Sequence, residues 1–384
     1  MKILVLYDYF FPAQKAGGII RSLYNLCKCT NDVVDYYIVC SCFDYQEKQI
    51  MPNIQVNKWT CLEKKINIYY IDYNVVSVIF LHDLFVKISP CIVYINGIFS
   101  YKFNILPLIT LKFARLPLRI IVAPRGMLQQ GAIRSKMLKK NVFFTFTKWA
   151  GLFTSVQWHA TDNQEALDIQ GIYMNTKKIW IVPNIPNLYF QSSPFFLPPV
   201  KEKMQLNITT ISLITEKKNH KLAIKLLSKI SHNLKIFYTI YGPVKDVDYW
   251  QSCQEMMHNV PENIHIHYSG MLAPEDVERA LAQHHFFLLP TQGENFGHAI
   301  FEAMSAGLPV IISDQTPWRN LEAQKVGWDI PLSEPERFVA AIERAARMDQ
   351  AEYEQWSKSA HQYATDFIAK SNLKERYLEM FSTT

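Results

Sequence analysis

The chain has 384 residues, 49% of them hydrophobic and 19% charged, and 40 Lys plus Arg against 34 Asp plus Glu give a formal net charge of +6. This length predicts two domains with separate cores, and the apolar composition excludes a disordered chain. The charge excess is too small for this length to indicate a nucleic-acid partner; it suits phosphate-bearing small molecules or anionic lipid.

The compartment follows from the N-terminus and the cysteines. Residues 1–8 hold one Lys, a short apolar run and an acid, which is unlike a secretory signal. In the pairs Cys27/Cys29 and Cys40/Cys42 one residue stands between the thiols, not the two typical of zinc knuckles, so we expect idle thiols and no metal site. No apolar run reaches the roughly 18 residues of a membrane span. We therefore expect a cytoplasmic protein that meets a membrane only peripherally, at the inner face of the cytoplasmic membrane.

The first half alternates short β-branched runs with helical patterns. Strands are predicted at residues 3–6, 36–39, 91–95, 119–123, 155–159 and 178–182. This order predicts an α/β domain with a parallel sheet. Prolines in 183–186 and 194–199 interrupt the pattern, because Pro cannot donate to a sheet ladder, and we place the interdomain linker there.

The same alternation restarts after the linker. Strands are predicted at residues 207–213, 235–241, 264–268, 286–289 and 310–313. They indicate a second doubly wound unit. We therefore predict domains at 1–186 and 187–365, and a C-terminal helix in 366–384 that crosses back to the first domain.

The densest chemical pattern is a predicted strand, loop, helix, turn and strand over residues 290–314. Gly293 and Gly297 bracket the loop, which ends at a helix N-terminus where backbone N–H groups and the macrodipole favour phosphate oxygens. Helical side chains lean towards the N-terminus, so Glu302, with His298 one turn earlier, is expected to reach the mouth of the site.

Glu294 and Glu302 stand eight positions apart, a spacing that chance alone produces about once in such a chain. In this context it resembles the signature of the family 4 (group 1) retaining glycosyltransferases, of the kind that build bacterial surface polysaccharides such as lipopolysaccharide and O-antigen. The resemblance covers nearly the whole chain and implies the GT-B fold, two Rossmann-like domains facing a central cleft. It assigns the donor sugar to Glu294, the ribose to Glu302, and the phosphates to the backbone of Asn295, Phe296 and Gly297. The alternative is two unrelated surface acids.

Two further segments match the family. Gly17 and Gly18 open a helix after the first strand, where the family has a loop facing donor phosphates and acceptor, although ordinary turns contain Gly pairs as often. Lys218 precedes a helix that Asn219 is expected to cap, and it matches the Lys of the family's diphosphate clamp. Leu213 stands where the family has an Arg, which weakens the expected clamp unless another cation substitutes.

Other strand ends carry candidate residues. Arg125, in a Pro-Arg-Gly-Met-Leu string that similar enzymes share, is predicted to contact phosphate or acceptor, or alternatively to form a structural ion pair. Gly242 is expected to admit the nucleotide. Asn96 occupies a position where many relatives have His, so a proton shuttle is not expected there, and Asn184 resembles the family's hinge. Residues 105–119 mix apolar and basic residues in a way compatible with an anionic membrane surface.

The resemblance implies a metal-independent transfer with retention, without a cofactor, from a nucleotide-diphosphate sugar (UDP-sugar favoured) to a glycan or lipid-linked saccharide. Catalysis is assigned to Glu294, Lys218 and Arg125. Two alternatives stay open: a non-catalytic nucleotide-sugar-binding subunit, motivated by Leu213, and a sugar-nucleotide epimerase on the same scaffold, since fold does not fix function.

Overall fold

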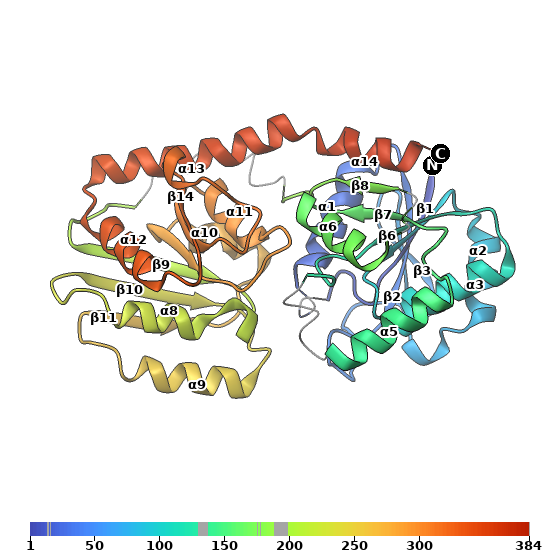
Figure 1. Cartoon of the computed structure of the whole chain (residues 1–384), viewed down its shortest axis with the longest axis horizontal. Coiled ribbons are helices and arrows are strands. Elements are labelled where there is room, and N and C mark those ends of the chain that lie inside the picture. The colour runs from blue at the N-terminus through green and yellow to red at the C-terminus, as the bar shows by residue number, and fades with distance from the viewer. Residues whose placement is uncertain are drawn as a thin grey trace. The chain divides into compact units, whose positions relative to one another are not determined.

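The computed structural model describes residues 1–13, 15, 17–129, 137–174, 176, 178–187 and 199–383. The chain forms two compact units, Met1–Ile185 with Asn372–Thr384, and Pro186–Ser371 (Figure 1). The division falls one residue before the expected position. The return to the first unit begins at Asn372 and not at 366, because helix α13 (Gln350–Ser371) runs on until Asn372 adopts a left-handed conformation with φ 44°.

The first unit is built on an eight-stranded sheet with the order β3-β4-β2-β1-β5-β6-β7-β8. Its strands are β1 (Lys2–Leu6), β2 (Asp35–Ser41), β3 (Trp59–Glu63), β4 (Ile66–Ile71), β5 (Ile92–Asn96), β6 (Arg119–Ala123), β7 (Gln157–Ala160) and β8 (Ile179–Ile181). All pairs are parallel except β3 with β4, an antiparallel edge pair that the sequence analysis did not predict. The central strands β1 and β5 are buried on both faces, which explains why they appear as continuous apolar runs.

Helices cover both faces of this sheet. They are α1 (Gly18–Thr30), α2 (Val78–Ile88), α3 (Leu106–Ala114), α5 (Met137–Trp149), α6 (Asn163–Ile172) and α14 (Leu373–Ser382). Side chains of α2, α3, α5 and α6 share one core, whereas α14 packs on α1. Arg119 fastens α14 to the sheet by donating to the Phe381 carbonyl at 3.0 Å.

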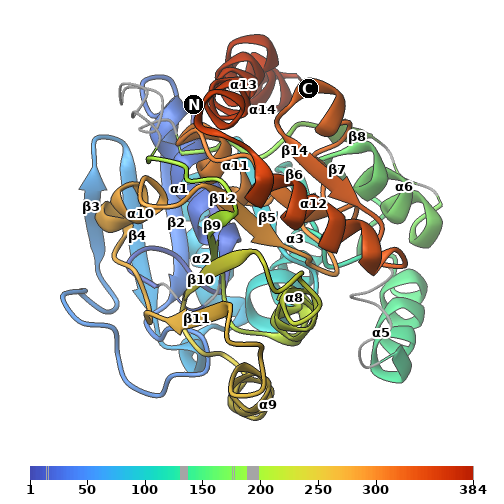
Figure 2. The same ribbon diagram turned by 90° about the vertical axis from the view of Figure 1, so that its left-hand side faces the viewer.

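The second unit has a six-stranded parallel sheet with the order β11-β10-β9-β12-β13-β14 (Figure 2). Its strands are β9 (Gln205–Ile211), β10 (Lys235–Tyr241), β11 (Ile264–Tyr268), β12 (Phe286–Leu289), β13 (Val310–Ser313) and β14 (Gly327–Ile330). Its helices are α8 (His220–Leu227), α9 (Val247–Met257), α10 (Val277–Leu281), α11 (His298–Ser305), α12 (Pro335–Arg347) and α13. One core lies under α8, α9 and α12, and another lies under α10, α11 and part of α13. The predicted α/β class with two doubly wound sheets is confirmed.

Shorter elements complete the fold. Three-residue 3-10 helices span Tyr73–Val75, Glu216–Lys218, Pro274–Asp276 and Glu322–Gln324, and a π-helical turn spans Tyr101–Ile105. Within the described ranges, no helix combines the length and apolar composition that crossing a membrane requires.

Each sheet has one point where the strand order reverses. In the first sheet it lies between β1 and β5, and in the second between β9 and β12. The loops that follow the two strands diverge there, and open α/β sheets bind ligands at this crevice outside the carboxyl ends of the strands.

Candidate active site

The loops after β9 and β12 are fastened to each other at the reversal point of the second sheet. Gln292 N–H donates to the Lys217 carbonyl at 2.8 Å, and Thr291 Oγ1 lies within hydrogen-bond distance of the same oxygen, at 3.1 Å. Asn219 was expected to cap α8 with its side chain, but it lies in the left-handed region and its Nδ2 donates to the Pro290 carbonyl at 3.0 Å. That side chain therefore joins the two loops.

Lys218 and Glu294 meet at this junction. Lys218 Nζ donates to Glu294 Oε1, and Thr291 Oγ1 lies 3.1 Å from the same carboxylate oxygen, so its one proton can go either to Glu294 or to the Lys217 carbonyl. The side chains are 19% and 12% exposed, so the pair is sheltered but reachable. Glu294 N–H donates to the Gln315 carbonyl at 2.8 Å, which anchors the backbone beneath the carboxylate. A cation and an anion, held by two adjacent strand ends, thus occupy the reversal point.

The β12 loop runs directly into the N-terminus of α11. Gly297 is the N-cap with φ 77°, and a Cβ there would come within 2.9 Å of Ile300 Cδ1, so both conformation and space favour glycine. Phe296 is buried, and its carbonyl accepts a hydrogen bond from Trp318 Nε1 at 2.7 Å. Gly293 N–H donates to Thr291 Oγ1 at 3.3 Å. The N–H groups of the first helical turn have no partner within the helix and suit an anion.

The remaining predicted donor residues lie on or beside α11. Glu302 is 2% exposed, and so is more enclosed than Glu294. His298 is the first residue of α11 and its ring lies 4.9 Å from that of Phe296. Asn295 is partly exposed in the loop before them. The residues that the sequence analysis assigned to the donor therefore lie on α11 or in the loop that leads into it.

Gly242 has a structural reason to be glycine. It follows β10 with φ 137°, and a Cβ there would lie 1.8 Å from the Ser212 carbonyl oxygen. Its N–H donates to the Gly270 carbonyl at 2.8 Å. The close approach of the loop after β9 therefore accounts for this glycine without any ligand.

Leu213 brings no charge to the site. It is partly exposed, and its carbonyl accepts from His220 Nε2 at 3.5 Å. Burial lowers the pKa of His220 to about 4, so this imidazole is neutral near neutral pH. Lys217 has an exposed surface, but burial lowers the pKa of its ammonium while the charge of Glu294 raises it, so both Lys217 and Lys218 bring positive charge near Glu294.

Arg125 is buried in the first unit among protein acceptors, and its assignment to catalysis stays a prediction. It is 5% exposed, its Nε donates to Asn96 Oδ1 at 2.9 Å, and its second terminal nitrogen donates to Tyr94 Oη at 2.7 Å. The remaining nitrogen donates to Asn184 Oδ1. Protein acceptors therefore engage all three guanidinium nitrogens, which matches the structural alternative, although through neutral oxygens.

Glu165 lies beside this network and is buried as well. Its carboxylate accepts from Gly126 N–H at 2.6 Å and from Thr161 N–H at 2.8 Å. Asp162 caps α6 by accepting from Glu165 N–H at 2.7 Å. Burial raises the pKa of Glu165. These contacts join the loops after β6 and β7, so they serve the fold of the first unit.

The reversal point of the first sheet holds Gly17 and an acid that the motif search missed. Gly17 is the N-cap of α1 with φ 89°, and α1 begins at Gly18. Asp8 follows β1 by two residues and accepts a hydrogen bond from Ser100 Oγ, in the loop after β5, at 2.6 Å. Burial raises the pKa of Asp8. Asp8 is the first acidic residue after the first predicted strand, and that position could have identified it as a candidate from the sequence.

Two further observations limit what else the site holds. Over the described ranges, no three His, Cys, Asp or Glu side chains are grouped so that they could bind a metal ion.

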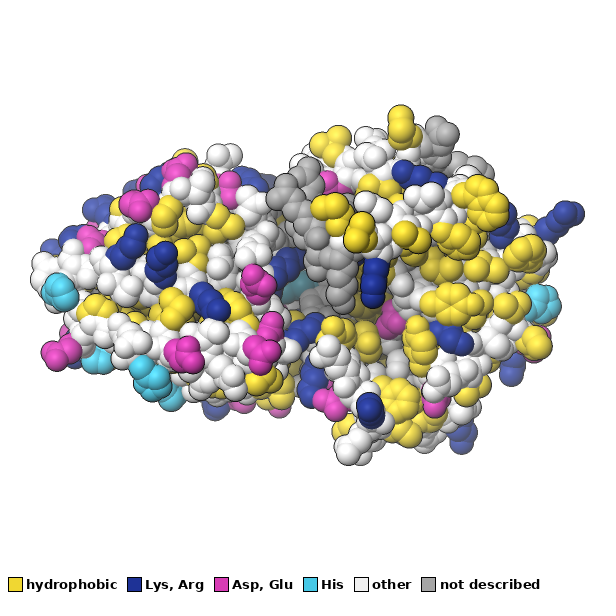
Figure 3. Space-filling model, turned by 60° about the horizontal axis from the view of Figure 1, so that its bottom comes forward, with side chains coloured by type: hydrophobic (Ala, Val, Ile, Leu, Met, Phe, Trp, Pro, Cys, Tyr) yellow, Lys and Arg dark blue, Asp and Glu magenta, His cyan; other side chains and the backbone are white. Residues whose placement is uncertain are grey.

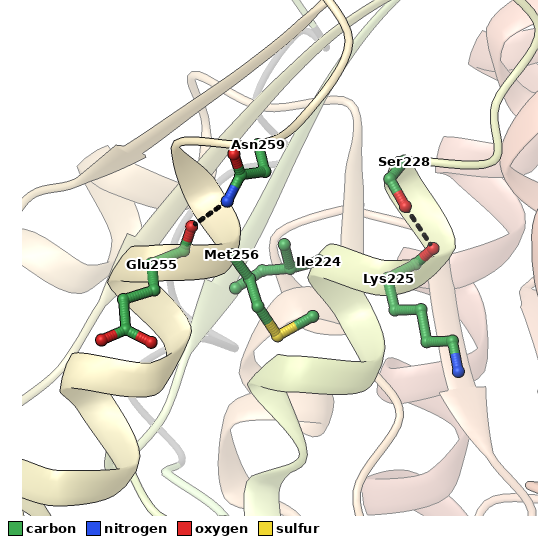
Figure 4. A pocket seen from close by; sticks show the side chains of 6 residues that line it. All are labelled: Ile224, Lys225, Ser228, Glu255, Met256 and Asn259. Atoms are coloured by element: carbon green, nitrogen blue, oxygen red, sulfur yellow. Dashed lines mark hydrogen bonds between the residues drawn. The ribbon is translucent and has the colours of Figure 1, made fainter.

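A groove between α8 and α9 lies at the carboxyl-terminal end of α8, whereas Lys218 precedes the amino-terminal end of that helix (Figure 4). The groove is lined by Ile224, Lys225, Ser228, Glu255, Met256 and Asn259. Ser228 and Asn259 bond to carbonyls of their own helical segments, so they offer little to a ligand.

Comparisons with known proteins agree with this architecture. Residues 195–363 match the family described as glycosyl transferases group 1. Sucrose-phosphate synthase from Thermosynechococcus elongatus is 13% identical, with 100% of both chains covered and a TM-score of 0.73. HepE of Anabaena, solved with UDP and glucose, is 14% identical over 100% of both chains with a TM-score of 0.71. WaaG, a glycosyltransferase involved in lipopolysaccharide biosynthesis, is 14% identical over 100% of both chains with a TM-score of 0.66. A search of curated proteins found no match.

The fold and the family match define the class. The protein is a glycosyltransferase with the GT-B fold. Within that class, most of its second unit, including the Lys218 and Glu294 loops, lies inside the region that matches group 1.

Proposed function

We propose that the protein is a family 4 enzyme that transfers a sugar, with retention and without a metal ion, from a nucleotide-diphosphate sugar to a glycan or lipid-linked saccharide. The observation that carries the proposal is the Lys218–Glu294 pair beside the N-terminus of α11, at the reversal point of the second sheet. UDP-sugars are the favoured donors. HepE with UDP-glucose, and a trehalose-6-phosphate protein from E. coli bound with UDP-2-fluoro glucose, support this choice.

The chemistry requires charge stabilisation on the leaving diphosphate. The bond from the anomeric carbon to the diphosphate oxygen breaks while the bond to the acceptor oxygen forms on the same face, and the acceptor proton leaves on the diphosphate. Lys218 and the N–H groups of the first turn of α11 face the growing negative charge. Glu294 accepts hydrogen bonds from hydroxyls of the donor sugar and Glu302 from those of the ribose, because a carboxylate accepts two such bonds at once.

The acceptor proposal rests on different support. WaaG, with the same fold, takes part in lipopolysaccharide biosynthesis, which supports a saccharide of the bacterial surface as acceptor. A lipid-linked acceptor would bring the enzyme to the inner face of the cytoplasmic membrane as a peripheral protein.

The test measures nucleotide release from UDP-, GDP- and ADP-sugars in the presence of lipid acceptors extracted from membranes. Glu294→Gln and Glu302→Gln are compared with Glu255→Gln, an exposed acid on α9 that serves as the matched control. We expect release from one donor, lost in the first two variants and kept in the control, and a product whose anomeric configuration by NMR matches the donor. Donor interconversion without acceptor would establish the epimerase instead.

One observation favours a second candidate. Leu213 replaces an Arg of the clamp, which is compatible with a non-catalytic nucleotide-sugar-binding subunit. That function predicts tight donor binding without release from any donor, and Leu213→Arg would then create activity where none existed.

A further inference from the structure

The outward side of α5 carries an apolar stripe. Leu138, Val142, Phe146 and Trp149 follow one another with the spacing of a single helix face. Their exposed fractions are 83%, 71%, 48% and 84%. Phe144, on the opposite side of the helix, is buried in the core of the first unit. α5 is therefore apolar towards solvent as well as towards the core, whereas a surface helix normally turns polar residues outward.

α3 extends this surface. Lys112 Nζ donates to the Ala150 carbonyl at 2.6 Å, which holds the end of α3 against the end of α5, and the next residue, Phe113, is 81% exposed. We call the four stripe residues and Phe113 the α5 face. Figure 3 shows hydrophobic side chains gathered over the unit that contains it, with basic side chains among them. Scattered single apolar residues are normal on a surface, but a contiguous group of large ones marks an interaction site.

The charge around the α5 face has one sign. Residues 84–161 contain 11 Lys or Arg and no Asp or Glu, whereas the other 306 residues contain 29 Lys or Arg and 34 Asp or Glu. Lys139 and Lys148 are exposed on α5, and Lys112 and Arg115 are exposed at the end of α3. In the part of the chain that the structure describes, no carboxylate pairs with any of these four. The mild positive charge of the whole protein is thus concentrated in this segment.

We propose that the α5 face docks on a lipid bilayer that contains anionic phospholipid. Aromatic and aliphatic side chains would enter the boundary between headgroups and acyl chains, and the surrounding lysines would contact the phosphates. A second copy of the chain fits less well, because a two-fold dimer would place like-charged lysines opposite each other with no acid to compensate. The inference extends the proposed lipid-linked acceptor, but it needs no turnover, so the two proposals can fail separately.

The test is co-sedimentation of the full chain with vesicles of phosphatidylcholine alone and of phosphatidylcholine mixed with phosphatidylglycerol. The α5 variant is Leu138→Ser/Val142→Ser/Trp149→Ser. The matched control replaces residues of the second unit that are 79%, 60% and 57% exposed: Val200→Ser/Val247→Ser/Met271→Ser. A charge variant is Lys139→Gln/Lys148→Gln. Because every changed side chain is exposed, circular dichroism should show wild-type folding for all three.

We expect wild type and control to bind the anionic vesicles and not the neutral ones, and the α5 variant to bind at least about tenfold more weakly. Each lysine near an anionic surface contributes about fivefold, so the charge variant should lose about 25-fold, and binding should weaken as salt rises. The proposal is overturned if wild type binds neither vesicle, if the α5 variant binds like wild type, or if the control loses as much. It is also overturned if wild type does not bind vesicles but sediments as a dimer in a velocity experiment, and the α5 variant sediments as a monomer.

Discussion

Replacing Lys218 with Met tests whether the cation at the reversal point acts on the donor diphosphate. The change keeps the length and apolar stem of the side chain but removes the ammonium that donates to Glu294. A charged hydrogen bond to phosphate contributes about 1.5–3 kcal/mol, so kcat/KM for the donor should fall about 10- to 150-fold. Most of the loss should lie in kcat if Lys218 faces charge that grows in the transition state. Initial rates of nucleotide release over a range of donor concentrations measure both constants.

The same change leaves the Glu294 carboxylate beside the Thr291 hydroxyl, whose one proton the Lys217 carbonyl can also accept, so a loss of stability must be separated from a loss of catalysis. Lys225→Met is the matched control, because Lys225 is exposed on the same helix that Lys218 precedes. Thermal melts show whether either variant unfolds early. The reasoning is refuted if Lys218→Met, folded at the assay temperature, keeps kcat/KM within about twofold of Lys225→Met.

Three further predictions concern the fold around the sites. Gly242→Ala should destabilise the second unit by more than about 3 kcal/mol, because its Cβ would lie 1.8 Å from the Ser212 carbonyl oxygen, whereas Gly270→Ala, with no atom within 4 Å, should cost about 1 kcal/mol; denaturant melts of both variants check this. Arg125→Met should lower the free energy of unfolding of the first unit by about 3 kcal/mol and leave the donor KM of the folded fraction unchanged; a raised KM without destabilisation would restore its ligand role. Burial lowers the pKa of His159 to about 3, whereas the unfolded chain binds a proton at this residue below about pH 6.5. The free energy of unfolding should therefore fall as the pH drops below 6.5, by about 2 kcal/mol at pH 5. His159→Gln should flatten this acid slope in melts between pH 7 and 5, and an unchanged slope would contradict it.

The sequence predicted the strands that the fold buries on both sides. Residues 286–289 and 310–313 form β12 and β13 at the predicted bounds, and every residue of both is buried, since a strand covered on both faces must be apolar throughout. Residues 235–241 and 264–268 also form β10 and β11 at the predicted bounds, although only one residue of β11 is buried. The edge strands β3 and β14 were missed. β3 has no fully buried residue, so its pattern carries no strong signal. β14 begins at Gly327, where a Cβ would lie 2.0 Å from the Val310 carbonyl oxygen, and glycine ordinarily argues against a strand.

The local part of the candidate site was also accessible from sequence, because Gly293 to Glu302 are neighbours along the chain and helix geometry fixes their arrangement. The pairing of Lys218 with Glu294 was not. It depends on β9 lying beside β12 although β10 and β11 intervene in the sequence. Strand order arises from packing of the whole sheet, so only the family resemblance linked those two residues before the fold was known.

Arg125 and Lys218 show why a cation at a strand end is ambiguous until its burial is known. A guanidinium has five N–H groups on three nitrogens, and in Arg125 every nitrogen already donates to a protein oxygen while the side chain is buried. An ammonium has three N–H groups, and the recorded bond of Lys218 uses one, in a side chain that remains 19% exposed. Asn96, where no proton shuttle was expected, and Asn184, which resembles the family's hinge, both accept hydrogen bonds from Arg125. Each cation therefore keeps two N–H groups beyond these bonds, and burial distinguishes them: Arg125 is enclosed within the first unit, whereas the side chain of Lys218 stays accessible to a ligand.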